Sequence, residues 1–578
     1  MIGKEPAMAV AFVVALDSQS VPCYHNTFPR YGLRIIPAIA LLILALAHWG
    51  TAQTIDPPGP IAVTTYHYDN YRTGWNHSES RLTPTTVGSG EFQLLETVPL
   101  DDRVDAQPLV VTRVNVTAGS FQGVHNVVYV ATANNTVYMI DADNGTVLWS
   151  QNLGNTVPTA IGCGGRAGNV GITSTPVIDI ANRTLYVMAY TNSTNGPSYL
   201  LHALDLGNLS DNVMPQVVSA SHTLTDGTRF NFNAGYQLQR PGLLLANGNV
   251  YAGFGAFCDA FPNLSRGWLL GWDAASLAPL SSNQLVDTQA TNQYSYFLSS
   301  IWMSGYGLAA DDSGNVLFVT GNSLSGTYDS LTMTNLQESV VKVSPDLSTV
   351  VDFFTPSNQS TLDQYDTDFG SGGVLVLPDQ TGSTPQLAVA AGKFGTMYLM
   401  NEDNLGGYSS MTNNVLGSYL IGDCWCGESY FVDSDGAPRV LSSGEGTAIS
   451  WELNTTLPTP TLTAVSESPI VSGGQQDAGF FTTISSNGTL NPVIWALSRA
   501  NQGNIYLYAF DPDNLQGGLM NQLFQGVAGS WPTVTANANL VPVVANGKVF
   551  VASYKQLAIF GLSALARKAD QRAPSSHE

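Results

Sequence analysis

The stretch that decides the fold is NVVYVATANNTVYMIDADNGTVLW, residues 126–149. Two runs of alternating apolar and polar residues flank a polar turn, and a second turn at Gly145 leads to Trp149. Such alternation is typical of strands with one buried face, and joins rich in Asn and Gly are typical of hairpins. The unit therefore predicts antiparallel strands that cannot bury their faces without neighbours.

Related units recur along the chain. Clear second runs lie at 198–209, 267–277, 395–406 and 504–515, and weaker ones lie at 339–353, 446–455 and 556–562. Their spacing exceeds the roughly 40–50 residues of a minimal four-stranded blade, so the blades carry long loops. Eight sheets around one axis bury what a lone hairpin cannot. We therefore predict one all-β, eight-bladed β-propeller of four-stranded antiparallel blades over residues 53–565, with 53–100 supplying an outer or closing strand.

Charge and missing motifs exclude several classes of function. The 578 residues carry a formal net charge of -22, and no cluster of Lys or Arg offsets it. Nucleic acids and anionic membrane surfaces would therefore be repelled. The chain has no GxSxG, HExxH or Walker motif, which argues against a serine hydrolase, a zinc protease or a P-loop enzyme.

The first residues predict export. Arg30 and Arg34 precede an apolar run at 35–47. The run is shorter than the ~20 residues of a membrane span and matches the apolar region of a signal peptide. Residues 1–52 are therefore predicted to be a signal peptide or an uncleaved anchor, which makes the body periplasmic, extracellular or envelope-anchored. A polar tail, residues 566–578, is predicted to follow the propeller.

Four cysteines remain after the leader, and an oxidising compartment would favour disulfides between them. They are Cys163, Cys258, Cys424 and Cys426, and the sequence cannot choose among their three pairings. In an extended strand, Cys424 and Cys426 would have their Cα atoms near the ~7 Å limit, which predicts a strained local bridge. Metal binding by this pair stays open, although no second Cys/His pair at zinc spacing supports it.

The turn DADNG, residues 141–145, looks like the start of a calcium loop. Position twelve of that loop would be Asn152 instead of a bidentate Glu. We therefore interpret Asp141 as the cap of a tight turn, Gly145 as its left-handed residue and Trp149 as packing between blades.

The centre of the chain carries a different pattern. It reads SIWMSGYGLAADDSGNVLFVTGN (300–322), LDQYDTDFGSGG (362–373) and VAAGKFGTMYLMN (389–401). Here the chain resembles the quinoprotein dehydrogenases, eight-bladed propellers that bind pyrroloquinoline quinone (PQQ) beside a Ca²⁺ ion. The repeat YMIDADNGTVLW is similar to that family's tryptophan-docking motif.

The resemblance implies roles for four residues. Trp302 would stack on the quinone, Asn322 and Asp366 would ligate Ca²⁺, Asp366 would also be the catalytic base, and Lys393 would assist catalysis by bonding the quinone oxygen. The residue types suit this chemistry, because indoles stack on planar rings and amide and carboxylate oxygens bind Ca²⁺. Asp363 and Asp368 would then fix the loop that presents Asp366. Each of the four could instead serve packing or turns alone.

The chain also departs from that family. The region 190–200, where a Glu would ligate Ca²⁺, has no acid. The family's adjacent-cysteine ring would fall at 161–168, which holds Cys163 alone, and no haem-binding CxxCH exists. Any electrons would therefore pass to a separate acceptor. Residues 66–87 and 105–111 look like the opening of exported bacterial propellers described only as PQQ-like.

Two hypotheses remain open from the sequence. The first is a PQQ- and Ca²⁺-dependent oxidoreductase acting on a small alcohol or sugar. The second is a non-catalytic propeller that binds a protein, a glycan or a cell-envelope partner. A propeller hosts both kinds of function, so the fold cannot decide.

Overall fold

The computed structural model describes residues 61–158, 169–257, 264–290, 299–471, 478–498, 503–531 and 539–563. The chain divides into two units, Met1–Ile55 and Asp56–Glu578. The first unit lies outside the described residues, as do Cys163, Cys258 and the tail at 566–578. Within the described ranges, no helix has the length and apolar character that crossing a membrane requires.

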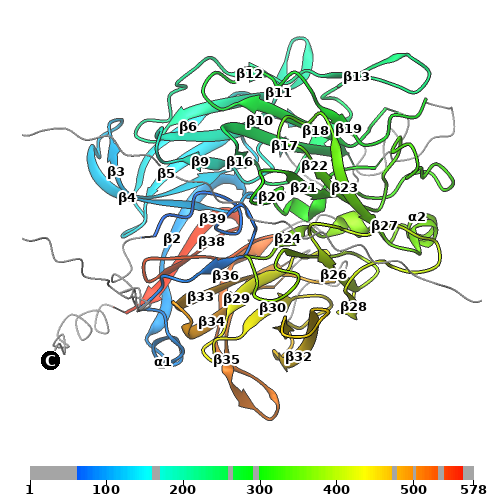
Figure 1. Ribbon diagram of the computed structural model, residues 1–578. Helices are drawn as coiled ribbons and strands as arrows, with labels where there is room; N and C mark the ends of the chain where they lie inside the picture. Colours follow the sequence, from blue (N-terminus) through cyan, green and yellow to red (C-terminus); the bar gives the residue numbers. More distant parts are fainter. Residues whose placement is uncertain are drawn as a thin grey trace, which may run out of the picture. The chain divides into compact units, whose positions relative to one another are not determined.

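The second unit is an eight-bladed β-propeller, which confirms the predicted fold class (Figure 1). Each blade holds four antiparallel strands, and in the first seven blades they follow one another along the chain. The strands of blades 1 to 4 are β3 (Leu109–Val116), β4 (Gly123–Ala131), β5 (Thr136–Asp141), β6 (Val147–Asn152); β9 (Val177–Asp179), β10 (Thr184–Ser193), β11 (Gly196–Asp205), β12 (Gln216–Val217); β16 (Leu244–Ala246), β17 (Asn249–Ala256), β18 (Trp268–Asp273), β19 (Gln284–Leu285); and β20 (Ala309–Ala310), β21 (Val316–Val319), β22 (Val340–Val343), β23 (Val350–Thr355).

Blades 5 to 7 continue the pattern, and blade 8 is closed by a strand from the start of the ring. Their strands are β24 (Val374–Val376), β25 (Leu387–Ala391), β26 (Thr396–Asn401), β28 (Gly417–Leu420); β29 (Ser429–Val432), β30 (Pro438–Ser442), β31 (Ile449–Asn454), β32 (Thr461–Glu467); β33 (Phe481–Asn487), β34 (Leu490–Leu497), β35 (Gly503–Gln516), β36 (Leu519–Trp531); and β37 (Val543–Ala545), β38 (Lys548–Ala552), β39 (Tyr554–Leu562), β2 (Phe92–Arg103).

The ring closes in blade 8, where β2 pairs with β39 in antiparallel register. Phe92 lies opposite Leu562, and Val98 lies opposite Leu557. A strand from early in the sequence thus becomes the outer strand of the last blade, so this pairing joins the two ends of the ring. The predicted closing strand is confirmed within residues 92–103.

Short elements extend the blades or lie in their loops. In blade 3, β15 (Gln237–Gln239) also pairs with β17. In blade 4, β27 (Gly407–Tyr408) runs parallel to β23, and in blade 7, β1 (Trp75–Asn76) runs parallel to β33. The remaining pieces are the pairs β7 (Val157–Pro158) with β8 (Asn169–Val170) and β13 (Ser221–Thr223) with β14 (Arg229–Asn231), the helices α1 (Pro84–Val87) and α2 (Gln359–Tyr365), and the 3₁₀ turns η1 (Met303–Gly305) and η2 (Phe369–Ser371).

Apolar side chains pack between every pair of neighbouring blades. One buried cluster joins blades 8, 1 and 2, the next joins blades 2 and 3, and a third joins blades 3, 4 and 5. Three further clusters join blades 5 and 6, 6 and 7, and 7 and 8. Removing this surface from water is the main force that holds the ring. Trp149 packs against the first cluster, as expected of an inter-blade indole.

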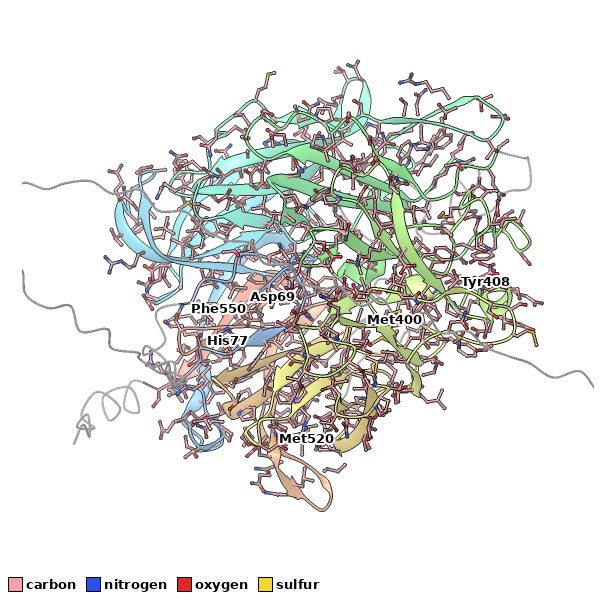
Figure 2. All side chains as sticks on the ribbon, viewed as in Figure 1. Asp69, His77, Met400, Tyr408, Met520 and Phe550 are labelled. Carbon is pink, nitrogen blue, oxygen red and sulfur yellow. A yellow bond between two sulfur atoms is a disulfide. The ribbon has the colours of Figure 1, made fainter. Side chains whose placement is uncertain are left out.

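Residues 61–76, called here the axial segment, run along the inner strands of the ring (Figure 2, where Asp69 of this segment is labelled). Each blade in turn exchanges a hydrogen bond with this segment. The bonded pairs from blade 1 to blade 8 are Val63–Val110, Thr64–Ile178, Arg72–Leu243, Asn70–Ala310, Tyr71–Val376, Thr73–Tyr430, Gly74–Ile484 and Tyr68–Val544.

The middle of the axial segment is held by Arg72, which is fully buried. Its guanidinium donates to the carbonyls of Leu308, Tyr66 and Asp69 at 2.7, 2.8 and 3.0 Å. Next to it, the ring of Tyr306 contacts Tyr66 edge to face, and its hydroxyl donates to the carbonyls of Arg72 and Glu428. Polar backbone that no strand pairs is thereby satisfied in the interior.

The turn DADNG forms as predicted. The carboxylate of Asp141 accepts the backbone N–H groups of Asp143 and Asn144 at 2.8 and 3.2 Å, and Gly145 has a φ of 74°. A side chain at that φ would be strained, which explains the glycine. Asp141 therefore acts in this turn as a cap.

Candidate functional site

The four predicted site residues lie at the same end of blades 4 and 5. In an antiparallel pair, the residues before the first strand and those after the second strand are neighbours. Trp302 precedes β20 and Asn322 follows β21, and these two strands pair. In the same way, Asp366 precedes β24 and Lys393 follows β25. The blade geometry therefore gathers residues that are far apart in the sequence.

Lys393 is the centre of the group. Its ammonium lies 3.4 Å from Oδ1 of Asp366 and 3.0 Å from Oδ2 of Asp368, and it donates to the carbonyl of Asp366 at 3.0 Å. The side chain of Lys393 is 11% exposed, whereas that of Asp366 is 58% exposed. The lysine is therefore a mostly buried cation with one carboxylate on its inner side and one facing solvent.

Electrostatics keep this lysine charged. Burial alone would lower the pKa of Lys393, but the carboxylates of Asp368 and Asp366 outweigh burial and raise that pKa above its ordinary value. An ammonium held by two acids stays protonated at any physiological pH. The site therefore presents a permanent positive charge.

Asn322 joins the two acidic residues. Its side-chain amide donates to Oδ1 of Asp366 at 3.1 Å, and its backbone N–H donates to Oδ1 of Asp368 at 3.2 Å. Both oxygens of Asp368 are thus engaged, one by Asn322 and the other by Lys393. Asp366 keeps a large exposed surface while its position is fixed.

Two indoles flank the lysine. The ammonium of Lys393 lies 5.5 Å from the ring centroids of both Trp302 and Trp425. The guanidinium of Arg240 lies 5.8 Å from the Trp302 ring. Within about 6 Å, cations and indole faces attract one another. The site thus combines flat aromatic surface with positive charge, a combination that suits a planar anionic ligand.

The third aspartate of the stretch 362–373, Asp363, anchors the loop that carries Asp366. It lies in α2, accepts the backbone N–H of Ser323 at 3.1 Å, and is bonded by the amides of Gln337 and Gln359. Burial raises the pKa of Asp363 to about 7. The stretch therefore clusters carboxylates because Asp363 anchors the loop, Asp368 pairs with the lysine and Asp366 faces outward.

Glu338 is a further buried acid that sequence reasoning missed. Its Oε2 accepts the backbone N–H of Phe369 at 2.6 Å, and its Oε1 is buried without a hydrogen-bond partner. Burial, together with the nearby Asp368 and Asp363, raises the pKa of Glu338 well above its ordinary value. Glu338 therefore supports the turn η2 through its bond to the backbone of Phe369.

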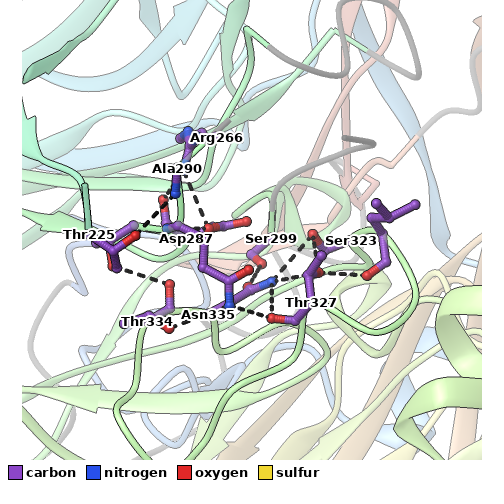
Figure 3. A network of polar contacts seen from close by, with 12 residues as sticks. Thr225, Arg266, Asp287, Ala290, Ser299, Ser323, Thr327, Thr334 and Asn335 are labelled. Carbon is purple, nitrogen blue, oxygen red and sulfur yellow. Dashed lines mark hydrogen bonds and ion pairs between the residues drawn. The ribbon is translucent and has the colours of Figure 1, made fainter. Parts of the chain in front are cut away.

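A polar network joins Ser299, Thr327 and Asn335 (Figure 3). Ser299 donates to Oδ1 of Asn335 at 2.5 Å, and the amide of Asn335 donates to Thr327 at 3.0 Å. The same amide reaches Ser323 at 3.4 Å. The network fixes the start of the loop that carries Trp302 to the loop that carries Asn322.

The site loops also hold unusual backbone. Met303, Ser304 and Asp366 have φ angles of 45°, 49° and 55°, in the left-handed region that side chains disfavour. Such strain persists only where surrounding contacts impose it, and it gathers at functional sites. The backbone conformation next to Trp302 and at Asp366 is therefore imposed by tertiary contacts and not by the intrinsic preference of these residues.

The two cysteines of CWC lie beside the site and form a disulfide with each other. Their Cα atoms are 4.9 Å apart, well inside the range of ordinary disulfides, so the predicted separation near 7 Å is wrong. The chain bends at Trp425 and Cys426 instead of extending. Ser371 ties this bend to the aspartate loop, donating to the carbonyls of Cys424 and Asp368 at 2.7 and 3.0 Å.

Comparisons with known proteins bear on the fold. No protein-family model matches the sequence, and the search of curated proteins gives no significant match. A europium-containing methanol dehydrogenase superposes with a TM-score of 0.56, covering 88% of this chain and 99% of that chain at 11% identity. The quinohemoprotein alcohol dehydrogenase of Comamonas testosteroni gives 0.55, covering 86% and 80% at 12% identity. The enzyme ADHIIG of Pseudomonas putida HK5 gives 0.52, covering 87% and 80% at 14% identity.

The fold is that of the quinoprotein alcohol dehydrogenases. At identities of 11% to 14%, this similarity concerns the backbone fold alone and does not show that the chain shares the activity of these enzymes. The fold alone does not show whether a cofactor binds, so that depends on the side chains of this chain.

A planar quinone suits the site, whereas Ca²⁺ suits it poorly. The indole of Trp302 packs on Gly321, where an added Cβ would lie 3.0 Å from its Nε1, and Lys393 stands beside it. Nitrogen donors already engage Oδ1 of Asp366, which Asn322 and Lys393 both bond, and both oxygens of Asp368. Among the described residues, no group of three acids brings its oxygens within 4.8 Å of one another.

Sequence reasoning named four residues that the structure brings together and missed several that complete the group. The missed residues share the site through charge or ring contacts, and they are Arg240, Glu338, Ser371 and Trp425. A signal for Trp425 was present, since it lies within the CWC motif. No local pattern marks Arg240 or Glu338, because they come from other loops.

Proposed function

We propose that this protein is an exported quinone-dependent oxidoreductase that oxidises an alcohol or a sugar and passes electrons to a separate acceptor. The carrying observation is the Lys393 ammonium, mostly buried between Asp366 and Asp368 and within 5.5 Å of two indole rings. The quinoprotein-type fold supports the same assignment.

The residues would divide the work of binding. Trp302 offers a partly buried aromatic face for a tricyclic ring to stack on. Lys393 and Arg240 supply positive charge for carboxylate and carbonyl oxygens. A bound PQQ would supply the two-electron acceptor that the side chains themselves lack.

Asp366 would receive the proton of the substrate hydroxyl. Its carboxylate is exposed on one side and held on the other by Asn322 at 3.1 Å and by Lys393 at 3.4 Å. A positioned carboxylate of this kind contributes about 10²–10⁴-fold to a rate when it acts as general base. Asn322 then serves by orienting Asp366.

Lys393 would also take the electrostatic part that Ca²⁺ plays in the family that the sequence resembles. Its charge is fixed by Asp366 and Asp368, and it stands where a metal would need the same oxygens. The proposal therefore expects quinone binding that does not require added calcium. Export rests on the apolar run at 35–47, which lies outside the described residues.

Quinone binding tests the proposal directly. The purified protein is titrated with PQQ, once with a chelator and once with Ca²⁺, and tryptophan fluorescence and quinone absorbance are followed. We expect saturable quenching with one PQQ per chain in both conditions, because Trp302 and Trp425 line the site. Alcohol- and sugar-dependent reduction of an artificial electron acceptor is then measured with the loaded protein.

Three variants locate the activity. Lys393→Met should weaken PQQ binding about tenfold or more, because a charge-assisted hydrogen bond is lost. Asp366→Asn should keep PQQ binding and lose turnover by about 10²-fold or more. Lys548→Met is the matched control, since Lys548 is 10% exposed and pairs with Asp143 at 2.6 Å in blade 8, away from blades 4 and 5.

The alternative is a non-catalytic propeller that binds a protein, a glycan or an envelope component. It would be supported if PQQ failed to bind with or without Ca²⁺, or if Lys393→Met and Lys548→Met bound PQQ equally. Binding without turnover of any alcohol or sugar would remove the oxidoreductase assignment while keeping a quinone site.

A further inference from the structure

A buried carboxyl group beside the disulfide has no partner that explains its burial. Glu428 has no exposed surface, and both Oε1 and Oε2 are buried without a hydrogen-bond partner. Buried polar groups are nearly always hydrogen-bonded, because burial without a partner is costly. A cation bound by these two oxygens would offset the cost of burying them without a donor.

The nearest ligand-type atoms are the two sulfurs. One oxygen of Glu428 and the sulfurs of Cys424 and Cys426 all lie within 4.8 Å of one another, and both cysteines are fully buried. A cation at the centre of such a triangle would stand at most about 2.8 Å from each atom, against Zn–S distances of ~2.3 Å. Once the S–S bond is broken, the two sulfurs would have to move apart to the spacing of two ligands of one tetrahedral ion, with the carboxylate oxygen of Glu428 already nearby.

We propose that Cys424, Cys426 and Glu428 form a redox-gated site for a thiophilic divalent cation such as Zn²⁺. The disulfide present in the structure is the closed state of this site. An external dithiol opens it by transferring two electrons and two protons, which breaks the S–S bond, gives two thiols and leaves the dithiol as a disulfide. The cation then binds two thiolates and the carboxylate and displaces two thiol protons to solvent.

The ligand set points to this class of metal. The two thiolates are soft ligands that favour Zn²⁺, Cd²⁺ or Co²⁺ over Ca²⁺ or Mg²⁺, and Zn²⁺ also accepts a carboxylate oxygen. Three protein ligands leave one tetrahedral position open for water. The site is separate from the oxygens of Asp366 and Asp368, so this inference does not depend on the proposed oxidoreductase activity.

The site would be coupled to the aspartate loop. Ser371 bonds both the carbonyl of Cys424 and that of Asp368, at 2.7 and 3.0 Å. Trp425, between the two cysteines, lies 5.5 Å from the Lys393 ammonium. A change from disulfide to metal-bound thiolates would therefore move groups that contact Lys393.

The test uses the full chain in a Cys163→Ser/Cys258→Ser background, which removes other thiols after the leader. The protein is reduced with a phosphine under anaerobic conditions, its fold is checked by near-ultraviolet circular dichroism, and it is titrated with Cd²⁺ alone. We expect one Cd²⁺ per reduced chain with a thiolate-to-metal absorption band, and none for the oxidised chain. Absence of binding by the folded, reduced chain, or loss of the fold on reduction, would overturn the proposal.

The third ligand is tested by Glu428→Gln, which keeps the shape of the side chain. Affinity for Cd²⁺ should fall about tenfold or more relative to the same background, and Cys424→Ser should abolish the absorption band. Equal affinity of the Gln variant would contradict the role of Glu428. Should that variant fail to fold, X-ray absorption of the zinc-loaded parent decides, since two sulfur neighbours with oxygen support the site and a shell without two sulfurs refutes it.

Discussion

Two regions of the ring hold a buried cation in opposite ways. In the axial segment, Arg72 is fully buried and its guanidinium bonds neutral oxygens, mostly backbone carbonyls. In the candidate site, Lys393 is mostly buried and bonds two carboxylates, one of which is 58% exposed. The axial segment contacts all eight blades, whereas the site joins loops around blades 4 and 5.

The partners of the two cations indicate different roles: Arg72 stabilises the ring, and Lys393 is placed to bind a ligand. The carbonyl groups that Arg72 bonds are fixed in the buried backbone and cannot move toward a ligand, so Arg72 serves to hold these backbone segments together. Lys393 has an exposed partner, and a bound anion could share its charge. Variants should therefore lower the free energy of unfolding strongly in the axial segment and more weakly in the site, and the following predictions run from the largest expected change to the smallest.

Replacing Arg72 should have the largest effect. Arg72→Met leaves buried carbonyls of several loops without a donor, so the free energy of unfolding should fall by on the order of 5 kcal/mol, or the protein should fail to fold. Urea denaturation followed by tryptophan fluorescence measures this. Arg183→Met is the control, because Arg183 is 48% exposed and 4.0 Å from Asp205, and its loss should cost less than about 1 kcal/mol.

Acid should weaken the axial segment through His67. Burial is the main cause that lowers the pKa of His67 to about 3, and the charge of Arg72 adds to it. The unfolded chain takes up this proton near pH 6.5 and the folded chain does not, so the full stability is present above pH 6.5. The contribution of His67 to the free energy of unfolding should therefore fall by about 3 kcal/mol between pH 7 and pH 4.

The variant His67→Phe isolates this contribution. It keeps the ring that stacks on Tyr66 at 4.5 Å and contacts Tyr306 at 5.0 Å. The stability gap between the parent and this variant should shrink as pH falls from 7 to 4, measured by urea denaturation at each pH. Parallel curves for the two proteins would show that His67 does not stay neutral in the folded state.

Lys393→Met should have an intermediate effect on stability. Asp368, whose side chain is 6% exposed, would lose its ion pair, and the free energy of unfolding should fall by about 2–3 kcal/mol. Lys548→Met should cost about 1 kcal/mol, because its partner Asp143 is 56% exposed and can be solvated. An equal cost for the two lysines would remove the distinction between a built site and an ordinary ion pair.

Trp302→Leu should change stability least and binding most. The indole is only partly buried, so the free energy of unfolding should stay within about 1 kcal/mol of the parent. PQQ affinity should fall about tenfold or more, because the flat stacking surface is gone. Isothermal titration measures PQQ affinity and urea denaturation measures the free energy of unfolding, both on the same preparation. A large fall in both would indicate that Trp302 serves packing and does not bind the quinone directly.

The fold was predictable because its signal repeats. Alternation in units such as 126–149 marks the strands of each blade, and Asp–Gly turns mark their ends. The axial segment gave no such signal. His67, Tyr68 and Arg72 take left-handed backbone, and Arg72 is explained only by carbonyls from other blades, as at Leu243 and Leu308.

The site was predictable in part. Trp302, Asn322, Asp366 and Lys393 were found through resemblance and order along the chain, and their convergence follows from antiparallel pairing in blades 4 and 5. Their chemical roles stay predictions. The engagement of Asp368 by Lys393 and the burial of Glu338 depend on side-chain packing between distant loops, which no local pattern encodes.

The closing strand has a consequence for how the chain folds. The backbone N–H of Ile61 bonds the side chain of Asn546, 485 positions later in the sequence. In the same way, β2 can pair only after β39 has formed near the end of the chain. Contacts of such separation raise the contact order and slow folding, because most of the chain must be ordered before they form. The edge of β2 that pairs with β39 stays open until the last hairpin has formed, so closure of the ring is expected late in folding, and the open edge is a site for aggregation until then.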